Sequence, residues 1–173
     1  NNARDAVSFF QAAKRKYDLQ QRYKNGVFVK YQKEFLDKAT ELNPNYVEAY
    51  LFRAEKVETS AVNKLLWYNK VLEIEPNNYT AKQAKENLDK QLYSTLYTAI
   101  DNDRLDEIQK ALQFGLLKTA EPQNGKNLVE YAIFKDNAPI LSVLLNNPTL
   151  LSSNIDLQPE RLLAEAIRNK SIR

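Results

Sequence analysis

The sequence predicts an all-α protein, an α-solenoid in which pairs of helices stack on one another. Apolar residues recur at spacings of three and four along nearly the whole chain, and no segment alternates apolar and polar residues as a half-buried strand would. The segments 38–45 and 70–77 resemble each other, and they place Pro44 and Pro76 32 residues apart. This period is typical of helical repeats, whose units bury their apolar faces against their neighbours.

Four helices are expected in the first part of the chain, over residues 3–24, 27–42, 45–57 and 60–74. Asn25-Gly26 separates the first two helices. The second ends before Pro44, because the residue preceding a proline is pushed out of the helical region. Asn45 followed by Glu48 is a capping-box signature and predicts the start of the third helix. Thr59-Ser60 supplies the turn and the cap for the fourth.

One long helix is expected from Tyr79 to about Ile100, because this stretch contains neither Gly nor Pro. A short helix should follow and end at Gly115, the residue type best suited to the left-handed position after a helix. Two further segments are predicted over 127–135 and 138–146, the second opened by Asn137 with Pro139 in its first turn. A loop containing Pro122 precedes this pair, and a final helix should begin at Pro159.

Composition argues against catalysis. The chain has no Cys and no His, which removes disulfides, thiol nucleophiles, zinc sites built from these residues and every His-based acid–base mechanism. Its three Gly are too scattered to form a phosphate-binding loop. We therefore expect no enzyme activity, no metal and no cofactor. No apolar window reaches the roughly 18 residues that a membrane span requires. The absence of Met predicts an excised fragment or a processed chain.

Positive charge is concentrated at the start of the chain. Residues 1–40 hold nine Lys or Arg against four acids, whereas the whole chain has a formal charge of only +3. A basic stripe can bind nucleic acid, an anionic membrane or an acidic protein. It can equally be a solvated helix face, and both interpretations stay open.

The first half, residues 1–92, resembles the tetratricopeptide repeat (TPR), a helix-turn-helix unit of about 34 residues. With Pro44 and Pro76 as the closing prolines, aromatic and small residues fall at the family's packing positions, namely Tyr50, Ala54, Tyr68 and Val71, with Leu19, Tyr23, Leu36 and Ala39 in the preceding unit. That preceding unit departs from the pattern at Gln20 and Gln32, where small residues are usual.

The second half, residues 93–173, resembles ankyrin repeats of about 33 residues. Its repeat is carried by Ala99, Leu112 and Gly115, which recur 33 residues later as Ala132, Leu145 and Pro148. The segment 124–132 looks like the family's opening segment, without its usual Thr-Pro-Leu-His. A degenerate third unit surrounds Leu162, Leu163 and Ala166.

The two resemblances also imply binding residues. In TPR proteins the first helix of each repeat lines the ligand groove, which implies Tyr17, Gln21, Glu48, Phe52, Glu55, Gln83 and Asn87. Phe52 is the expected anchor, unless it packs against the neighbouring helix. In ankyrin repeats the loop tips and first helices contact partners, which implies Lys118, Glu121, Gln123, Lys126, Glu130 and Lys135, unless these are merely solvated.

An acidic cluster lies where the long helix should end, at Asp101, Asp103, Asp106 and Glu107. Such a cluster could hold a metal or form a carboxylate pair. Its place between two helices instead favours capping and interaction with the helix dipole.

We therefore expect a non-catalytic scaffold or adaptor that binds a protein or peptide on its concave repeat surfaces. Fusions of this composition are similar to bacterial proteins, including secreted effectors, which predicts a cytoplasmic location or delivery into a host cell. Two alternatives remain: binding of nucleic acid or anionic membrane through the basic N-terminal helices, or a regulatory role within a larger enzyme.

Overall fold

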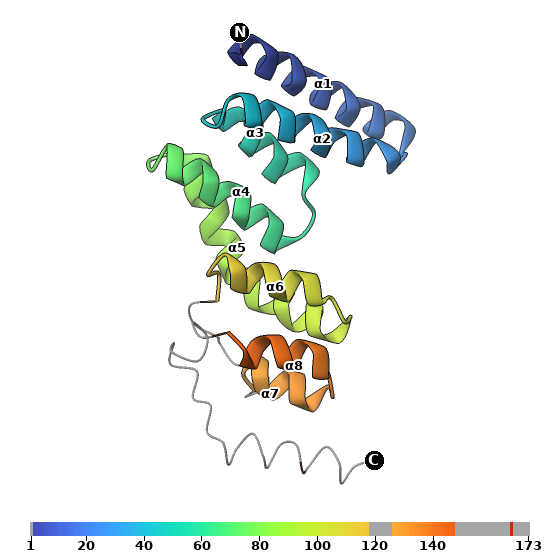
Figure 1. Ribbon diagram of the computed structural model, residues 1–173, viewed down its shortest axis with the longest axis vertical. Coiled ribbons are helices and arrows are strands. Elements are labelled where there is room, and N and C mark those ends of the chain that lie inside the picture. The colour runs from blue at the N-terminus through green and yellow to red at the C-terminus, as the bar shows by residue number, and fades with distance from the viewer. Residues whose placement is uncertain (1, 118–125, 148–166, 168–173) are drawn as a thin grey trace. The chain divides into compact units, whose positions relative to one another are not determined.

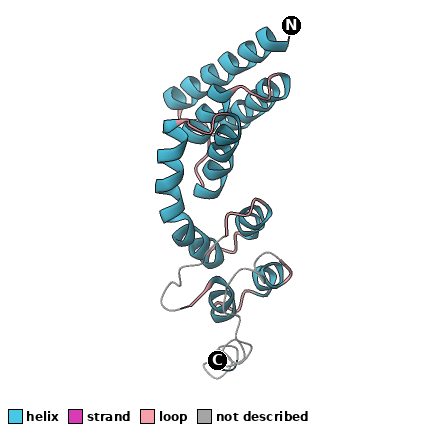
Figure 2. Cartoon of the chain, turned by 90° about the vertical axis from the view of Figure 1, so that its left-hand side faces the viewer, coloured by secondary structure: helices cyan, strands magenta, loops and turns pink. Residues whose placement is uncertain are grey.

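The protein is all-α. The computed structural model describes residues 2–117, 126–147 and 167 (Figure 1), and within these ranges the chain forms helices and loops without a β-strand (Figure 2). The elements are α1 (Asn2–Tyr23), α2 (Val27–Leu42), α3 (Val47–Phe52), the π-helix η1 (Arg53–Val57), α4 (Ala61–Ile74), α5 (Tyr79–Asp101), α6 (Leu105–Gln113), α7 (Leu128–Phe134) and α8 (Ala138–Leu145). Contacts divide the chain into two compact units, Asn1–Asp89 and Lys90–Arg173, so the division falls within α5.

In the first unit, α1 and α2 form a hairpin whose core is built from large and small side chains in contact. Phe10 and Ala13 of α1 pack against Leu36 and Ala39 of α2, and Ala49 and Val57 extend this core to α3 and η1. Small residues let the helix backbones approach closely while the large ones fill the space between them. This core therefore joins the α1–α2 pair to α3 and η1 of the next pair.

The turn between α1 and α2 confirms the break predicted at Asn25-Gly26. Lys24 adopts the left-handed conformation at φ 51°, whereas Gly26 has an ordinary helical φ of −62°. Asn25 closes the turn, because its Oδ1 accepts a hydrogen bond of 2.9 Å from the Val27 N–H. The left-handed Lys24 and the side chain of Asn25 thus form the turn.

The start of α3 corrects the predicted capping box. Asn45 does not cap the helix: the N-cap is Tyr46, and no side chain accepts a hydrogen bond there. Instead, the Asn45 N–H donates to Oδ1 of Asn43 at 3.2 Å, within the turn that precedes the helix. The Pro44 carbonyl accepts the Tyr50 hydroxyl at 3.1 Å. These hydrogen bonds within the turn form in place of the predicted capping box.

The third helix also departs from the predicted continuous α-helix. After Phe52 the chain widens into η1, and the Glu58 N–H donates to the Arg53 carbonyl at 3.0 Å, an i→i−5 bond. Ser60 is the N-cap of α4 as expected from its position, but its side chain makes no capping bond. The α3–η1–α4 segment therefore lacks side-chain caps at both helix starts.

The two Pro-containing turns have matching backbones. Asn43 and Glu75 are C-caps with similar dihedral angles, φ, ψ of −137°, 90° and −123°, 85°. In each turn the N–H three residues later returns to the C-cap carbonyl, at 3.1 Å from Tyr46 and at 3.0 Å from Asn78. The similar sequences around Pro44 and Pro76 therefore adopt similar local structures.

The second unit contains a different recurring turn. Asp103 and Asp136 both take the left-handed conformation, with φ of 54° and 56°. The next N–H in each turn reaches back to a small residue, from Arg104 to the Ala99 carbonyl at 2.8 Å and from Asn137 to the Ala132 carbonyl at 2.9 Å. This is the Schellman pattern of helix termination. The two turns begin at Ala99 and Ala132, the pair that the sequence places one period apart.

Other helix ends in this unit agree with prediction. Gly115 follows α6 with φ 61°. Asn137 caps α8 by accepting the Ile140 N–H at 3.2 Å, with a proline in the first turn. The box that sequence reasoning missed lies at α7, where Asn127 and Glu130 each accept the other's backbone N–H at 2.9 Å.

Three predicted features lie outside the described residues: the loop containing Pro122, the Pro148 position, and the final helix from Pro159 with the degenerate third unit at Leu162, Leu163 and Ala166. Among the described helices, none is long and apolar enough to cross a membrane.

Candidate partner-binding surfaces

An aromatic cluster joins the first helices of the two hairpins in the first unit. Phe10 and Tyr17 of α1 meet Phe52 of α3 edge to face, with ring centroids 5.7 and 5.5 Å apart. Tyr46 lies edge-on to Phe10 at 5.1 Å. Phe52 and Tyr17 are half-buried, so each ring packs against the neighbouring helix and still presents part of its surface. The structure thus brings together two of the residues implied by the TPR resemblance.

Exposed carboxylates border this cluster. Glu48 lies one helical turn before Phe52, and Glu55 follows in η1; neither forms an ion pair with another described residue. Burial chiefly raises the pKa of Tyr46 and of Tyr68, and the charges of Glu48 and Glu55, respectively, raise them further. Both carboxylates remain open to solvent.

The remaining implied residues of this unit are exposed. Gln21 lies one turn after Tyr17 on α1. Gln83 and Asn87 lie one turn apart on α5. Lys14 of α1 places its ammonium 5.6 Å from the Phe10 ring centroid, which puts a cation on the α1 side of the cluster.

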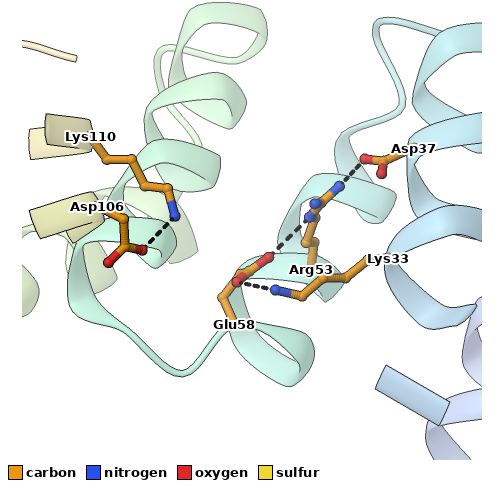
Figure 3. A network of polar contacts seen from close by, with 6 residues as sticks. All are labelled: Lys33, Asp37, Arg53, Glu58, Asp106 and Lys110. Carbon is orange, nitrogen blue, oxygen red and sulfur yellow. Dashed lines mark hydrogen bonds and ion pairs between the residues drawn. The ribbon is translucent and has the colours of Figure 1, made fainter. Parts of the chain in front are cut away.

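Sequence reasoning missed a buried ion network in the same unit (Figure 3). Nε of Arg53 lies 3.2 Å from Oε1 of Glu58, and Nζ of Lys33 lies 2.9 Å from the other carboxylate oxygen. Arg53 also pairs with Asp37. The side chains of Arg53 and Glu58 are only 11% and 4% exposed. Two cations and two anions cancel, which favours a structural role over a catalytic one.

Trp67 covers the same guanidinium. The Arg53 guanidinium lies 4.0 Å from the Trp67 ring centroid. The Tyr50 ring stacks on the Trp67 ring, with centroids 5.9 Å apart. A five-residue separation puts Arg53 and Glu58 on different faces of an α-helix, but it matches the i→i+5 bonding of a π-helix. Periodicity based on the α-helix therefore could not predict the Arg53–Glu58 pair.

In the second unit, Glu130 must be removed from the implied partner contacts. It is 2% exposed and serves as a member of the capping box of α7. Lys126 is half-buried: its carbonyl accepts the Tyr97 hydroxyl at 2.6 Å, and its ammonium lies 5.3 Å from the Phe134 centroid. Lys118, Glu121 and Gln123 lie outside the described residues.

Phe134 is an exposed aromatic residue of this unit, at 44%, and Phe114 is another, at 51%. Lys135 lies 5.8 Å from the Phe134 ring centroid and 2.6 Å from a carboxylate oxygen of Asp101. The hydrogen bond from Lys135 lowers the pKa of Asp101, more than partial burial raises it, and the Tyr131 hydroxyl lowers it further. The hydrogen bond to Asp101 raises the pKa of Lys135, and the one to Tyr131 raises it further. An exposed ring is thus flanked by two lysines, one of them fixed by an ion pair.

The acidic cluster at the end of α5 does not cap α6 with its side chains. The N-cap is Arg104, without a side-chain capping bond, and that arginine instead pairs with Glu107 at 2.9 Å. Asp103 accepts from Asn137 at 2.7 Å, and Asp106 pairs with Lys110 at 3.4 Å (Figure 3). Asp106 and Glu107 do lie in the first turn of α6, as expected for the helix dipole. Over residues 2–117 and 126–147, no three acidic side chains gather as a metal site.

The chain matches no protein-family model, no curated protein and no solved structure.

Proposed function

We propose that the protein is a non-catalytic scaffold that binds protein segments on the exposed faces of stacked helix pairs. One observation carries the proposal: the half-buried rings of Tyr17 and Phe52 meet edge to face between α1 and α3, and the exposed Glu48 and Glu55 lie within four residues of Phe52 in the sequence. A rigid aromatic surface with unpaired charges at its border is the kind of site at which a few residues supply most of an interface energy.

The recurring turns support a repeat architecture for this scaffold. We assign residues 1–92 to TPR-like repeats and residues 93–173 to ankyrin-like repeats, stacked as an α-solenoid. The matching turns at Pro44 and Pro76, and those at Asp103 and Asp136, are what repeated helix pairs require. In both repeat types the first helices would form the concave binding surface.

The charge around the rings suggests the chemistry of the partner. An apolar side chain of the partner would pack on Tyr17 and Phe52, while Lys or Arg beside it would pair with Glu48 and Glu55. Gln21 offers an exposed amide to the partner backbone. In the second unit, Phe134 with Lys126 and Lys135 would favour an acidic segment instead. The scaffold would therefore hold two segments of opposite charge.

Peptide selection followed by affinity measurement tests the proposal. Peptides selected from a random displayed library on the full chain should carry a basic residue next to an apolar one. Their affinity should fall about tenfold or more in Glu48→Lys/Glu55→Lys, because two attractions become repulsions.

The matched control is Glu41→Lys/Glu73→Lys, which makes the same charge change at exposed positions of α2 and α4. This variant should bind the selected peptides as the unaltered chain does. Equal losses in the two variants, or selected peptides without basic residues, would refute the assignment of this surface.

A further inference from the structure

The turn between α1 and α2 exposes apolar and aromatic side chains to an unusual degree. Tyr23 at the end of α1 is 63% exposed, Val27 at the start of α2 is 59% exposed, and Tyr31 is 41% exposed. In the view of Figure 1 this turn reaches beyond α3 and α4 of the same unit. We call residues 22–31 the α1–α2 tip.

The tip lies in the most basic part of the chain. Residues 14–30 contain six Lys or Arg and a single acid, Asp18, although the whole chain carries only +3. Arg22, Lys24 and Lys30 belong to the tip itself and are exposed. Lys30 has one weak partner, Glu34 at 3.8 Å, and both side chains of that pair are at least half exposed. The positive charge around the apolar side chains is therefore largely uncompensated.

We propose that the α1–α2 tip binds an anionic membrane surface, with Tyr23 and Val27 entering the interfacial region and the surrounding cations facing lipid headgroups. Charge complementarity selects an anionic partner, and the exposed apolar side chains select one with an apolar interior. Tyr is suited to this boundary because its ring is apolar and its hydroxyl is polar. This inference is independent of the partner-binding surfaces proposed above.

Several backbone N–H groups of the tip already have partners, which favours entry into a membrane interface. The Lys24 N–H donates to the Gln20 carbonyl at 2.8 Å, the Val27 N–H to Asn25 Oδ1, and the Val29 N–H to the Gly26 carbonyl at 3.0 Å. Backbone groups that already have partners add little cost when they leave water. The same bonds make these N–H groups poor donors for a phosphate backbone.

The aromatic rings on α2 also argue against nucleic acid as the partner. Lys16 of α1 places its ammonium 5.7 Å from the Phe28 centroid and 5.5 Å from the Tyr31 centroid. These contacts occupy ring surface on which an unpaired base would stack. Val27, central to the tip, has no ring to offer to a base. Membrane association accounts for all of these side chains together.

Vesicle binding by the full chain tests the proposal. Vesicles of phosphatidylcholine with about one third phosphatidylserine should bind the protein, and vesicles of phosphatidylcholine alone should not. Arg22→Gln/Lys24→Asn should weaken binding about thirtyfold, at about fivefold per cation. Asn is chosen at position 24 because it tolerates the left-handed conformation found there. Val27→Ser should weaken binding about tenfold through lost apolar contact.

The matched control is Lys38→Gln/Lys56→Gln, which removes two exposed lysines elsewhere in the unit and should leave affinity within about twofold. A Tyr23→Trp variant reports directly whether position 23 enters the membrane interface, because brominated lipids should quench the fluorescence of a tryptophan located there. Far-ultraviolet circular dichroism checks that each variant stays folded.

Three outcomes would overturn the proposal: no binding to anionic vesicles, equal loss in the tip and control variants, or no quenching of Tyr23→Trp by brominated lipid in a vesicle-bound sample. Fluorescence anisotropy with a single-stranded oligonucleotide tests nucleic acid as the competing partner. Binding to that oligonucleotide in the absence of binding to anionic vesicles would identify nucleic acid as the partner instead.

Discussion

The α3–η1–α4 segment of the first unit and the α7–α8 hairpin of the second use different means to hold short helices in place. In the first, neither helix start has a side-chain cap, and a buried ion network ties η1 to α2. In the second, Asn127 and Asn137 cap both helices. Short helices are marginal alone and depend on tertiary packing, to which a cap or an ion network adds. The comparison shows a long-range ion network in the segment that lacks side-chain caps, and local caps in the hairpin.

Breaking the ion network should lower the free energy of unfolding more than any other change. Arg53→Met leaves the carboxylate of Glu58 buried without its guanidinium partner. Removal of one member of a buried pair typically costs about 3–5 kcal/mol in free energy of unfolding, and we expect about 3 kcal/mol here because Lys33 still pairs with Glu58. Urea denaturation of the purified chain measures this loss.

An exposed pair provides the control for that substitution. Lys70→Met breaks the ion pair with Glu73, whose side chain is 62% exposed. Its effect should stay below about 1 kcal/mol. Comparable losses in Arg53→Met and Lys70→Met would contradict a buried, structural network.

Removing a cap should have the next largest effect, and only in the second unit. Asn137→Ala deletes the cap of α8 and the bonds from its amide to Asp103 and to the Ile100 carbonyl. We expect a loss of about 2 kcal/mol, because a cap alone contributes about 1. Ser60→Ala, at the equivalent position of α4, should change stability by less than about 0.5 kcal/mol. Equal thermal shifts in the two variants would remove the distinction between the segments.

A smaller effect, of opposite sign, is expected at the α1–α2 turn. Gly26 has a helical φ, and a Cβ placed there would meet no atom within 4 Å. Gly26→Ala should stabilise the protein by about 0.4–1 kcal/mol by restricting the unfolded chain. A lower melting temperature in this variant would show that the position requires glycine after all.

The smallest effect is a pH dependence in the second unit. The pKa of Asp101 is lowered in the folded state from its ordinary value of 3.8, mainly by Lys135. The unfolded chain therefore takes up a proton first, so the contribution is present above about pH 4 and is lost as pH falls through the depressed pKa. Because the Asp101 side chain is 38% exposed, we expect a contribution on the order of 0.3 kcal/mol. Asp101→Asn should show a correspondingly smaller loss of stability between pH 5 and 3, and an unchanged acid slope would contradict this assignment.

Much of the fold could be predicted because helix ends have local chemical signatures. Pro44, Gly115 and Asn137 act within one turn of their own position, and the ends they predict are the ends observed. The capping box at Asn45 was wrong because Asn43 binds the same stretch of backbone instead. A local signature fails when a neighbouring residue competes for the same groups.

The candidate sites were less predictable, because they depend on contacts between residues far apart in sequence. Helical spacing could place Phe52 on a first helix, but it could not show that Tyr17 packs against its ring. Glu130 follows Asn127 at the capping-box spacing that was assigned to Asn45 and Glu48, but the ankyrin resemblance implied a partner contact for it instead. The Arg53–Glu58 pair required a π-helix, which periodicity based on α-helices does not anticipate.

The most direct test of the proposed scaffold is photo-crosslinking from single positions of the first unit to a peptide selected on the full chain. A benzophenone amino acid at Glu48, next to the Phe52 cluster, should crosslink the peptide efficiently. The same group at Glu73, exposed on α4, should give little product. Equal yields from the two positions, or a higher yield from Glu73, would contradict partner binding on the first-helix face.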